Sequence, residues 1–232
     1  FVAGATWDDL PAEVRRTARL ALMDTLGATL AGIPARVSRI TADFAHRVWP
    51  GEEATVLTTG RKASAVGAAF ANGYAANAVD IDDCAIYTKG HPGVQIFPTA
   101  LALAEARGAS GAEMLTAMVV GYEVAHRAAR IWHATREVYQ ACGSWGSVAC
   151  AAVAAYLMGY DSIRISFPRH VKEALERELF YLKERFMGLE IIESTGSSIC
   201  LRMIIDPLEL KPAEVLRRMW KLSDDLLRYS LS

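Results

Sequence analysis

The chain has 232 residues, of which 52% are hydrophobic, and its formal net charge is −1. This length suffices for one or two domains with a hydrophobic core. The near-zero net charge gives no support for a nucleic-acid-binding protein, because such proteins usually have an excess of basic residues. No apolar run is long enough to cross a bilayer, and the four cysteines show neither CxxC pairs nor zinc-finger spacing to histidine. We therefore predict a cytoplasmic protein with reduced cysteines that binds no metal, nucleic acid or membrane.

The first part of the chain is predicted to be a series of helices. One begins at Pro11, whose missing N–H is tolerated in a first turn, and apolar residues at helical spacing continue it to Gly32. Further helices are expected over residues 40–48, 64–79, 98–107, 111–131 and 147–158, with a short strand over 54–58. The last helix is apolar on all sides, which indicates a buried position in a sizeable core.

The composition changes abruptly near residue 161. Residues 1–161 contain 37 alanines and 28 charged residues, whereas residues 162–232 contain two alanines and 23 charged residues. We therefore predict two segments of different origin, a helical domain over 1–161 and a C-terminal segment over 162–232.

The C-terminal segment has another pattern. Apolar spacing predicts a helix after Pro168 that extends to Leu189, then a strand over 199–205, then a helix after Pro212. A helix, a strand and a helix bury little surface alone, so this segment is expected to pack on the first segment or on another chain. The predicted fold class is mainly α.

The densest polar cluster of the first segment is Asp80-Ile81-Asp82-Asp83, followed by Lys89-Gly90-His91-Pro92-Gly93. Three carboxylates at the C-terminal end of a helix repel one another and oppose the helix dipole, so they need compensation by cations, donors or a ligand. His91 in a glycine-flanked loop is suited to general acid or base catalysis. Ordinary turn chemistry accounts for the same residues, so composition leaves both interpretations open. The other histidines, such as His126 and His133, are expected in the core or on the surface.

A series of motifs resembles the N-terminal part of the MmgE/PrpD family, which includes 2-methylcitrate dehydratase, cis-aconitate decarboxylase and an iminodisuccinate epimerase. Each motif is short, but their common order is specific. The matching stretches are Leu22-Met23-Asp24-Thr25-Leu26-Gly27, Ala68-Ala69-Phe70-Ala71-Asn72-Gly73, Asp80-Ile81-Asp82-Asp83, His91-Pro92-Gly93, Leu103-Ala104-Glu105 and Gly121-Tyr122-Glu123-Val124.

This resemblance implies a helical domain, a second lid domain and a homodimer. It also implies chemistry on a small di- or tricarboxylate without a metal or organic cofactor, in which a base removes a proton next to a carboxylate during dehydration, decarboxylation or epimerisation. By position, Asp80 and His91 match the family's catalytic aspartate and histidine. The candidate substrate-binding residues are Asp83, Cys84, Lys89, Gln140 and Ser144.

Some positions depart from the family pattern. Asn77 stands where a histidine often precedes the aspartates, and Cys84 stands where many members have threonine. Gln140 replaces a histidine that is catalytic in some members, and an amide cannot exchange a proton near neutral pH. The small-residue stretch 143–147 fits either a pocket lining or close helix packing.

After Gly159 the family continues with a lysine-bearing loop and the lid domain. Here, residues from Phe167 onward instead resemble archaeal PhoU-type phosphate-uptake regulators, in the runs 187–193, 204–207 and 216–219. A truncated or chimeric chain is therefore expected. Two functions follow: a lyase or isomerase with Asp80 and His91 at its centre, or a non-catalytic helical scaffold whose PhoU-like arm mediates assembly or regulation.

Overall fold

A computed structural model describes residues 4–135, 142–160, 163–166, 189–194 and 198–203. The chain divides into two compact units, one formed by residues 12–158 and the other by residues 1–11 together with 159–232. The described residues are mainly helical, which confirms the predicted fold class. Among them, no helix combines the length and the apolar character that a bilayer crossing requires.

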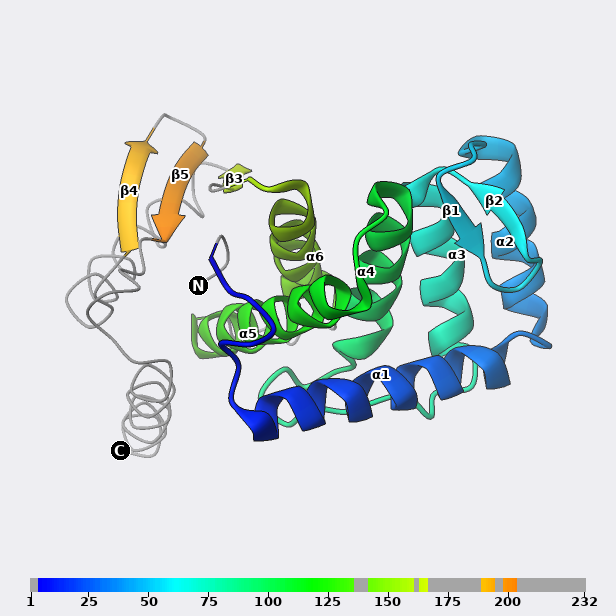
Figure 1. Ribbon diagram of the computed structural model, residues 1–232, viewed down its shortest axis with the longest axis horizontal. Helices are drawn as coiled ribbons and strands as arrows, with labels where there is room; N and C mark the ends of the chain where they lie inside the picture. Colours follow the sequence, from blue (N-terminus) through cyan, green and yellow to red (C-terminus); the bar gives the residue numbers. More distant parts are fainter. Residues whose placement is uncertain (1–3, 136–141, 161–162, 167–188, 195–197, 204–232) are drawn as a thin grey trace. The chain divides into compact units, whose positions relative to one another are not determined.

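The larger unit is a helical bundle (Figure 1). Its helix α4 is central, because it contacts α1, α3, α5 and α6, while α1 also contacts α3 and α5. The helices are α1 (Ala12–Gly32), α2 (Arg36–Val48), α3 (Ala65–Asn77), α4 (Gly93–Arg107), α5 (Gly111–Thr135) and α6 (Gly143–Met158).

Two helix starts follow directly from capping residues in the sequence. Ser64 precedes α3, and its hydroxyl accepts a hydrogen bond of 3.2 Å from the backbone N–H of Gly67. Ser110 and Glu113 form a reciprocal capping box at the start of α5: each side chain accepts a hydrogen bond from the other residue's backbone N–H. These contacts satisfy N–H groups that have no partner within the helix.

The predicted start of α4 was wrong. The helix begins at Gly93 rather than at Pro98, so Pro98 lies inside it. Pro92 occupies the N-cap position, and a side-chain carboxylate described below accepts the first N–H of the helix. Pro98 has no N–H to donate to the carbonyl of Val94, so α4 lacks that internal hydrogen bond. The helices α2 and α6 also begin earlier than predicted, and α5 ends later.

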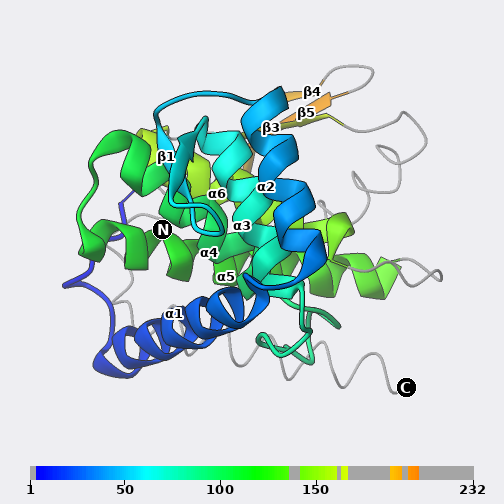
Figure 2. The ribbon, with the colours of Figure 1, turned by 90° about the vertical axis from the view of Figure 1, so that its right-hand side faces the viewer.

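A β-hairpin follows α2 (Figure 2). Strand β1 (Ala54–Val56) confirms the predicted strand, and it pairs antiparallel with β2 (Arg61–Ala63), which was not predicted because its residues show no strand pattern. Glu105 joins the hairpin to α4: its carboxylate accepts hydrogen bonds from the N–H and the hydroxyl of Thr55, both 2.7 Å, and contacts Lys62. The short motif that ends in Glu105 therefore has a structural role.

Small side chains allow the helices to approach closely. Six of the seven buried residues of α3 are alanine or glycine, and α6 buries Ala149, Ala152 and Ala155. The core around α4, α5 and α6 adds larger side chains, among which Ile96, Phe97, Met118 and Trp145 are almost fully buried. The high alanine content of the sequence is thus explained by helices that pack closely against one another.

The second unit contains a three-stranded antiparallel sheet of order β3-β5-β4. Its strands are β3 (Ile163–Ser166), β4 (Leu189–Ser194) and β5 (Ser198–Met203). Strand β5 confirms the strand predicted at 199–205, whereas the helix predicted to reach Leu189 is wrong at that end, because Leu189 begins β4. The remainder of that helix and the helix after Pro212 lie outside the described residues.

Candidate active site

The candidate site lies in the α3–α4 loop, residues 78–92, between the end of α3 and the start of α4. Asp80 and Lys89 have positive φ angles of 54° and 49°, and they are the described non-glycine residues with this backbone conformation. Such conformations cost about 1 kcal/mol or more each and concentrate at functional sites. Both residues are among the predicted site residues.

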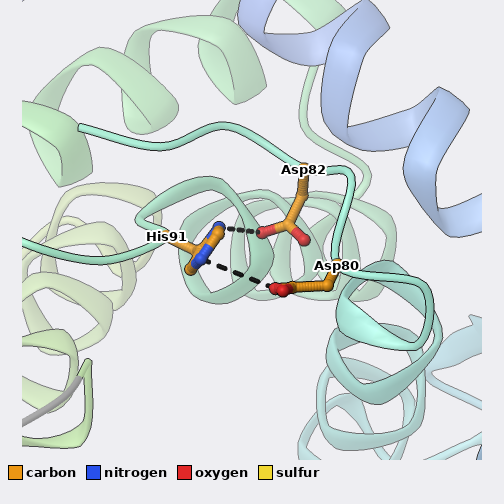
Figure 3. A group of neighbouring side chains, drawn as sticks. All are labelled: Asp80, Asp82 and His91. Atoms are coloured by element: carbon orange, nitrogen blue, oxygen red, sulfur yellow. Dashed lines mark ion pairs between the residues drawn. The ribbon is translucent and has the colours of Figure 1, made fainter.

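His91 lies between two carboxylates of this loop (Figure 3). Its Nδ1 is 3.0 Å from Oδ2 of Asp82, and its Nε2 is 3.6 Å from Oδ1 of Asp80. The Asp82 side chain is 0% exposed, that of His91 is 27% exposed and that of Asp80 is 78% exposed. One ring nitrogen therefore faces a buried carboxylate, and the other faces a carboxylate in water.

The contact between Asp82 and His91 is close but not aligned as a hydrogen bond. Within the described part of the chain, Asp82 Oδ2 and His91 Nδ1 are buried and have no hydrogen-bond partner. The other carboxylate oxygen of Asp82 accepts a hydrogen bond of 3.4 Å from the amide of Asn77. Buried polar atoms without hydrogen bonds are uncommon, and a catalytic role is one of several explanations for them. Catalytic contacts often align only when substrate binds.

The same three residues offer ligand atoms that lie within 4.8 Å of one another, a spacing that a shared cation also requires. However, Asp82 and Asp80 face different ring nitrogens of His91. One ring nitrogen and one oxygen of each carboxylate nevertheless meet this spacing, so the three side chains could also hold a cation. The arrangement is therefore compatible with proton exchange through the imidazole and with cation binding.

Asp83 lies next to Asp82 and has two internal hydrogen-bond partners. Its Oδ1 accepts from the backbone N–H of Gly93 at 2.8 Å, and its Oδ2 accepts from the hydroxyl of Tyr122 at 2.9 Å. Burial raises the pKa of Asp83, although these two hydrogen bonds act in the opposite direction. Burial and the charge of Asp83 raise the pKa of Tyr122, so the hydroxyl remains a donor.

Gly93 is enclosed by the same side chains. A Cβ atom at this position would overlap the hydroxyl of Thr25, and it would lie 2.6 Å from Oδ1 of Asp83 and 2.9 Å from the hydroxyl of Tyr122. Only glycine fits, which explains this part of the His91-Pro92-Gly93 motif.

One face of α5 supports the loop. Tyr122, His126, Arg130 and His133 recur at helical spacing: Tyr122 binds Asp83, and a ring nitrogen of His133 lies 2.9 Å from the carbonyl oxygen of Thr88. The guanidinium of Arg130 lies 5.3 Å from the ring centre of Tyr87, which also contacts the ring of His126. Burial lowers the pKa of His126. The spacing of His126 and His133, seven positions apart, permits one shared helix face, but it does not indicate that this face contacts the loop.

The start of α6 lies against the other end of the loop. The backbone N–H of His91 donates a hydrogen bond to the thiol sulfur of Cys142, and a Cβ at Gly90 would overlap that sulfur. Trp145 is buried, and Gly146 lies against the side chain of Gln95. The stretch 143–147 is therefore the first turn of a helix in close packing, one of the two predicted interpretations.

The predicted site residues do not all converge. Asp80 and His91 lie together, whereas Cys84 and Lys89 are exposed elsewhere in the loop and Ser144 is partly buried in α6. Gln140 lies outside the described residues. Asp82, which was not assigned a role, is the carboxylate nearest to His91. Asp82 belongs to the acidic cluster that the sequence singles out, but the sequence does not indicate which of the three carboxylates is buried.

A comparison of the sequence with known protein families finds a match. Residues 1–166 match the MmgE/PrpD N-terminal domain. A search of curated proteins found no match to the chain. The family match ends at residue 166, so the resemblance of later residues to PhoU-type regulators stays a prediction. Because the match covers well over half of the 232 residues, the chain belongs to the MmgE/PrpD family.

Proposed function

We propose that this chain carries the proton-transfer site of a lyase or isomerase that acts on a small di- or tricarboxylate. The observation that supports the proposal most is the position of His91 between buried Asp82 and exposed Asp80. Family membership supports the substrate class, because the resemblance implies dehydration, decarboxylation or epimerisation of such acids.

The imidazole of His91 is suited to the base role. A proton on Nδ1 faces the carboxylate of Asp82, which leaves the lone pair on Nε2 directed towards the more exposed side. When Nε2 takes a proton from the carbon next to a substrate carboxylate, the ring becomes positively charged. The buried carboxylate of Asp82 then stabilises that charge where little water competes.

In a dehydration, the electron pair of the broken C–H bond forms the carbon–carbon double bond, and the hydroxyl on the neighbouring carbon leaves with a proton as water. Asp80, beside Nε2, is placed to contact a substrate hydroxyl or to orient the imidazole. Lys89, Cys84 and Ser144 remain candidates for binding substrate carboxylates. Because both oxygens of Asp83 already accept internal hydrogen bonds, we assign its contribution to the loop instead.

The test is turnover by the purified chain. Citrate, 2-methylcitrate and cis-aconitate are supplied in turn, and formation or loss of the double bond is followed by ultraviolet absorbance. We expect activity with at least one acid and its loss in His91→Ala. A matched control is His46→Ala, since His46 contacts Thr59 beside the hairpin rather than the site. Equal turnover in His91→Ala and the parent chain would reject the proposal.

A second candidate is a non-catalytic scaffold with a C-terminal arm. The observation that favours it is that the family match ends at residue 166, while strands β4 and β5 of the second unit follow it. It predicts that deleting residues 162–232 changes the oligomeric state, which light scattering measures as the number of subunits per particle. The homodimer that the resemblance implies is tested in the same measurement. An unchanged subunit number after deletion would exclude an assembly role for the arm.

A further inference from the structure

Asp82 lies in the first third of the α3–α4 loop, and His91 is the last residue but one of this loop. Nine positions separate them in the sequence, yet their facing atoms are 3.0 Å apart. Closing a loop of this length has an entropic cost, and the direct contact is not an aligned hydrogen bond. Other contacts must therefore hold the two residues together.

The N–H of Ala85 donates a backbone hydrogen bond of 3.1 Å to the carbonyl of Gly90, and Asp83 supplies a second connection through its side chain. It follows Asp82 directly, and its Oδ1 accepts the N–H of Gly93, two residues beyond His91. That N–H belongs to the first residue of α4, so it has no acceptor within the helix. A negatively charged carboxylate is also favoured at a helix N-terminus. One carboxylate thus joins the segment that carries Asp82 to the segment that carries His91.

Tyr122 fixes this connection to the helical core. Its hydroxyl donates to Oδ2 of Asp83, and its partly buried ring packs against the core cluster of α4, α5 and α6. Thr25 from α1 also borders Gly93, so the carboxylate of Asp83 lies where three helices meet. Such an enclosed polar group has few alternative positions.

We infer that Asp83 and Tyr122 are positioning residues: without contacting substrate, they hold Asp82 against Nδ1 of His91 and thereby determine which ring nitrogen carries the proton. This inference rests on the proposed role of His91 in proton transfer. Tyr122 acts through Asp83 and Asp82, because its own hydroxyl bonds to Asp83 rather than to His91.

The experiment reads the tautomer of His91 directly. The intact chain is labelled with ¹⁵N-histidine, the His91 signals are assigned by their loss in His91→Gln, and ring nitrogen shifts are recorded at a pH where the imidazole is neutral. We expect the Nδ1–H form in the parent chain and a shift towards the Nε2–H form in Asp82→Asn. Tyr122→Phe, which changes no charge, should shift the tautomer in the same direction.

The double variant Tyr122→Phe with Asp82→Asn decides whether Tyr122 acts through Asp82. If it does, the double variant matches Asp82→Asn alone, because the contact is already lost. Asp83→Asn provides a second variant with the same expected direction. A parent-like tautomer in both Tyr122→Phe and Asp83→Asn, or an added shift from Tyr122→Phe in the Asp82→Asn background, would overturn the inference.

Thr55→Val serves as the structural control. It removes a side-chain hydrogen bond of 2.7 Å to Glu105, far along α4 from the loop, so it should lower stability without moving the His91 tautomer. Because the tautomer is read without substrate, the result is separate from turnover. A parent chain that shows no turnover but a Tyr122-dependent tautomer would reject the proposed function and retain the positioning role.

Discussion

The backbone N–H of His91 donates a hydrogen bond of 3.1 Å to the thiol sulfur of Cys142, which immediately precedes α6. The residue that carries the proposed chemistry is therefore held by α6 as well as by the loop. Gly90 is required beside it, because any side chain at this position would overlap the sulfur.

Replacing Cys142 by alanine should destabilise the chain. The change leaves the N–H of His91 without its acceptor and opens a small space beside Gly90, so we expect a loss of about 1 kcal/mol. Urea unfolding followed by circular dichroism measures it. The matched control is Cys84→Ala, at an exposed cysteine, which should leave the midpoint unchanged. Equal midpoints for the two variants would contradict the structural role of Cys142.

Two glycine-to-alanine changes should have opposite signs. Gly93→Ala forces a methyl group against Asp83, Tyr122 and Thr25, and such overpacking destabilises by about 1–3 kcal/mol. Gly27→Ala lies on the exposed face of α1 with no atom near its Cβ, so it should stabilise the helix by about 0.5–1 kcal/mol. Thermal unfolding of both variants tests the pair, and a neutral Gly93→Ala would show that the enclosure is looser than described.

The raised pKa of Asp83 predicts a pH dependence of stability. Since folding raises this pKa above its ordinary value of 3.8, the contribution of Asp83 is fully present below that value and is lost as the pH rises through the folded-state pKa. Asp83→Asn has no titrating group at this position. The parent chain should therefore gain stability relative to Asp83→Asn as the pH falls from neutral, in unfolding curves measured at matched pH. A difference that is constant with pH would refute this.

Glu105 should show the opposite dependence. Burial acts to raise its pKa, but hydrogen bonds from Lys62 and Thr55 outweigh burial and lower it below the ordinary value of 4.5. Its contribution is therefore present above that value and is lost as the pH falls through the folded-state pKa. Glu105→Gln should cost about 1 kcal/mol near neutral pH, since the group is partly solvated, and less in acid. Urea unfolding at both pH values is the measurement.

Asp82 and Asp80 should differ in their effect on turnover. If His91 exchanges a proton with the substrate, Asp82→Asn removes the buried charge that stabilises the protonated ring, and turnover should fall by about 100-fold or more. Asp80→Asn changes a largely solvated group and should have a smaller effect on turnover than Asp82→Asn. Steady-state kinetics on the preferred acid compares them. The opposite ranking would move the principal role to Asp80.

Much of the helical architecture could be predicted, because it depends on neighbouring residues. Pro11 and Gly32 bound α1, and the long apolar stretch that ends at Met158 marks α6. The order of short motifs identified the family that the match over residues 1–166 confirms. The start of α4 was misplaced, because the first N–H of this helix, at Gly93, is capped by Asp83 across the loop, a contact that local sequence pattern does not reveal.

Strand pairing was the least predictable part. The residues of β2 carry no strand pattern, and β4 begins at Leu189, which local apolar spacing had placed in a helix. Both segments become strands because they form hydrogen bonds with a partner strand. Local sequence pattern does not predict which segments will pair.

From the sequence alone, Asp80 and His91 emerge as a pair, because both belong to family motifs with recognisable chemistry. Only the tertiary structure separates the three carboxylates: Asp82 lies buried against His91, Asp83 is bound to Gly93 and Tyr122, and Asp80 lies in water. The physical reason is that burial and hydrogen bonding decide what a carboxylate does. For Asp83, the hydrogen bonds come from Gly93 at the start of α4 and from Tyr122 in α5, which is distant in sequence from the acidic cluster.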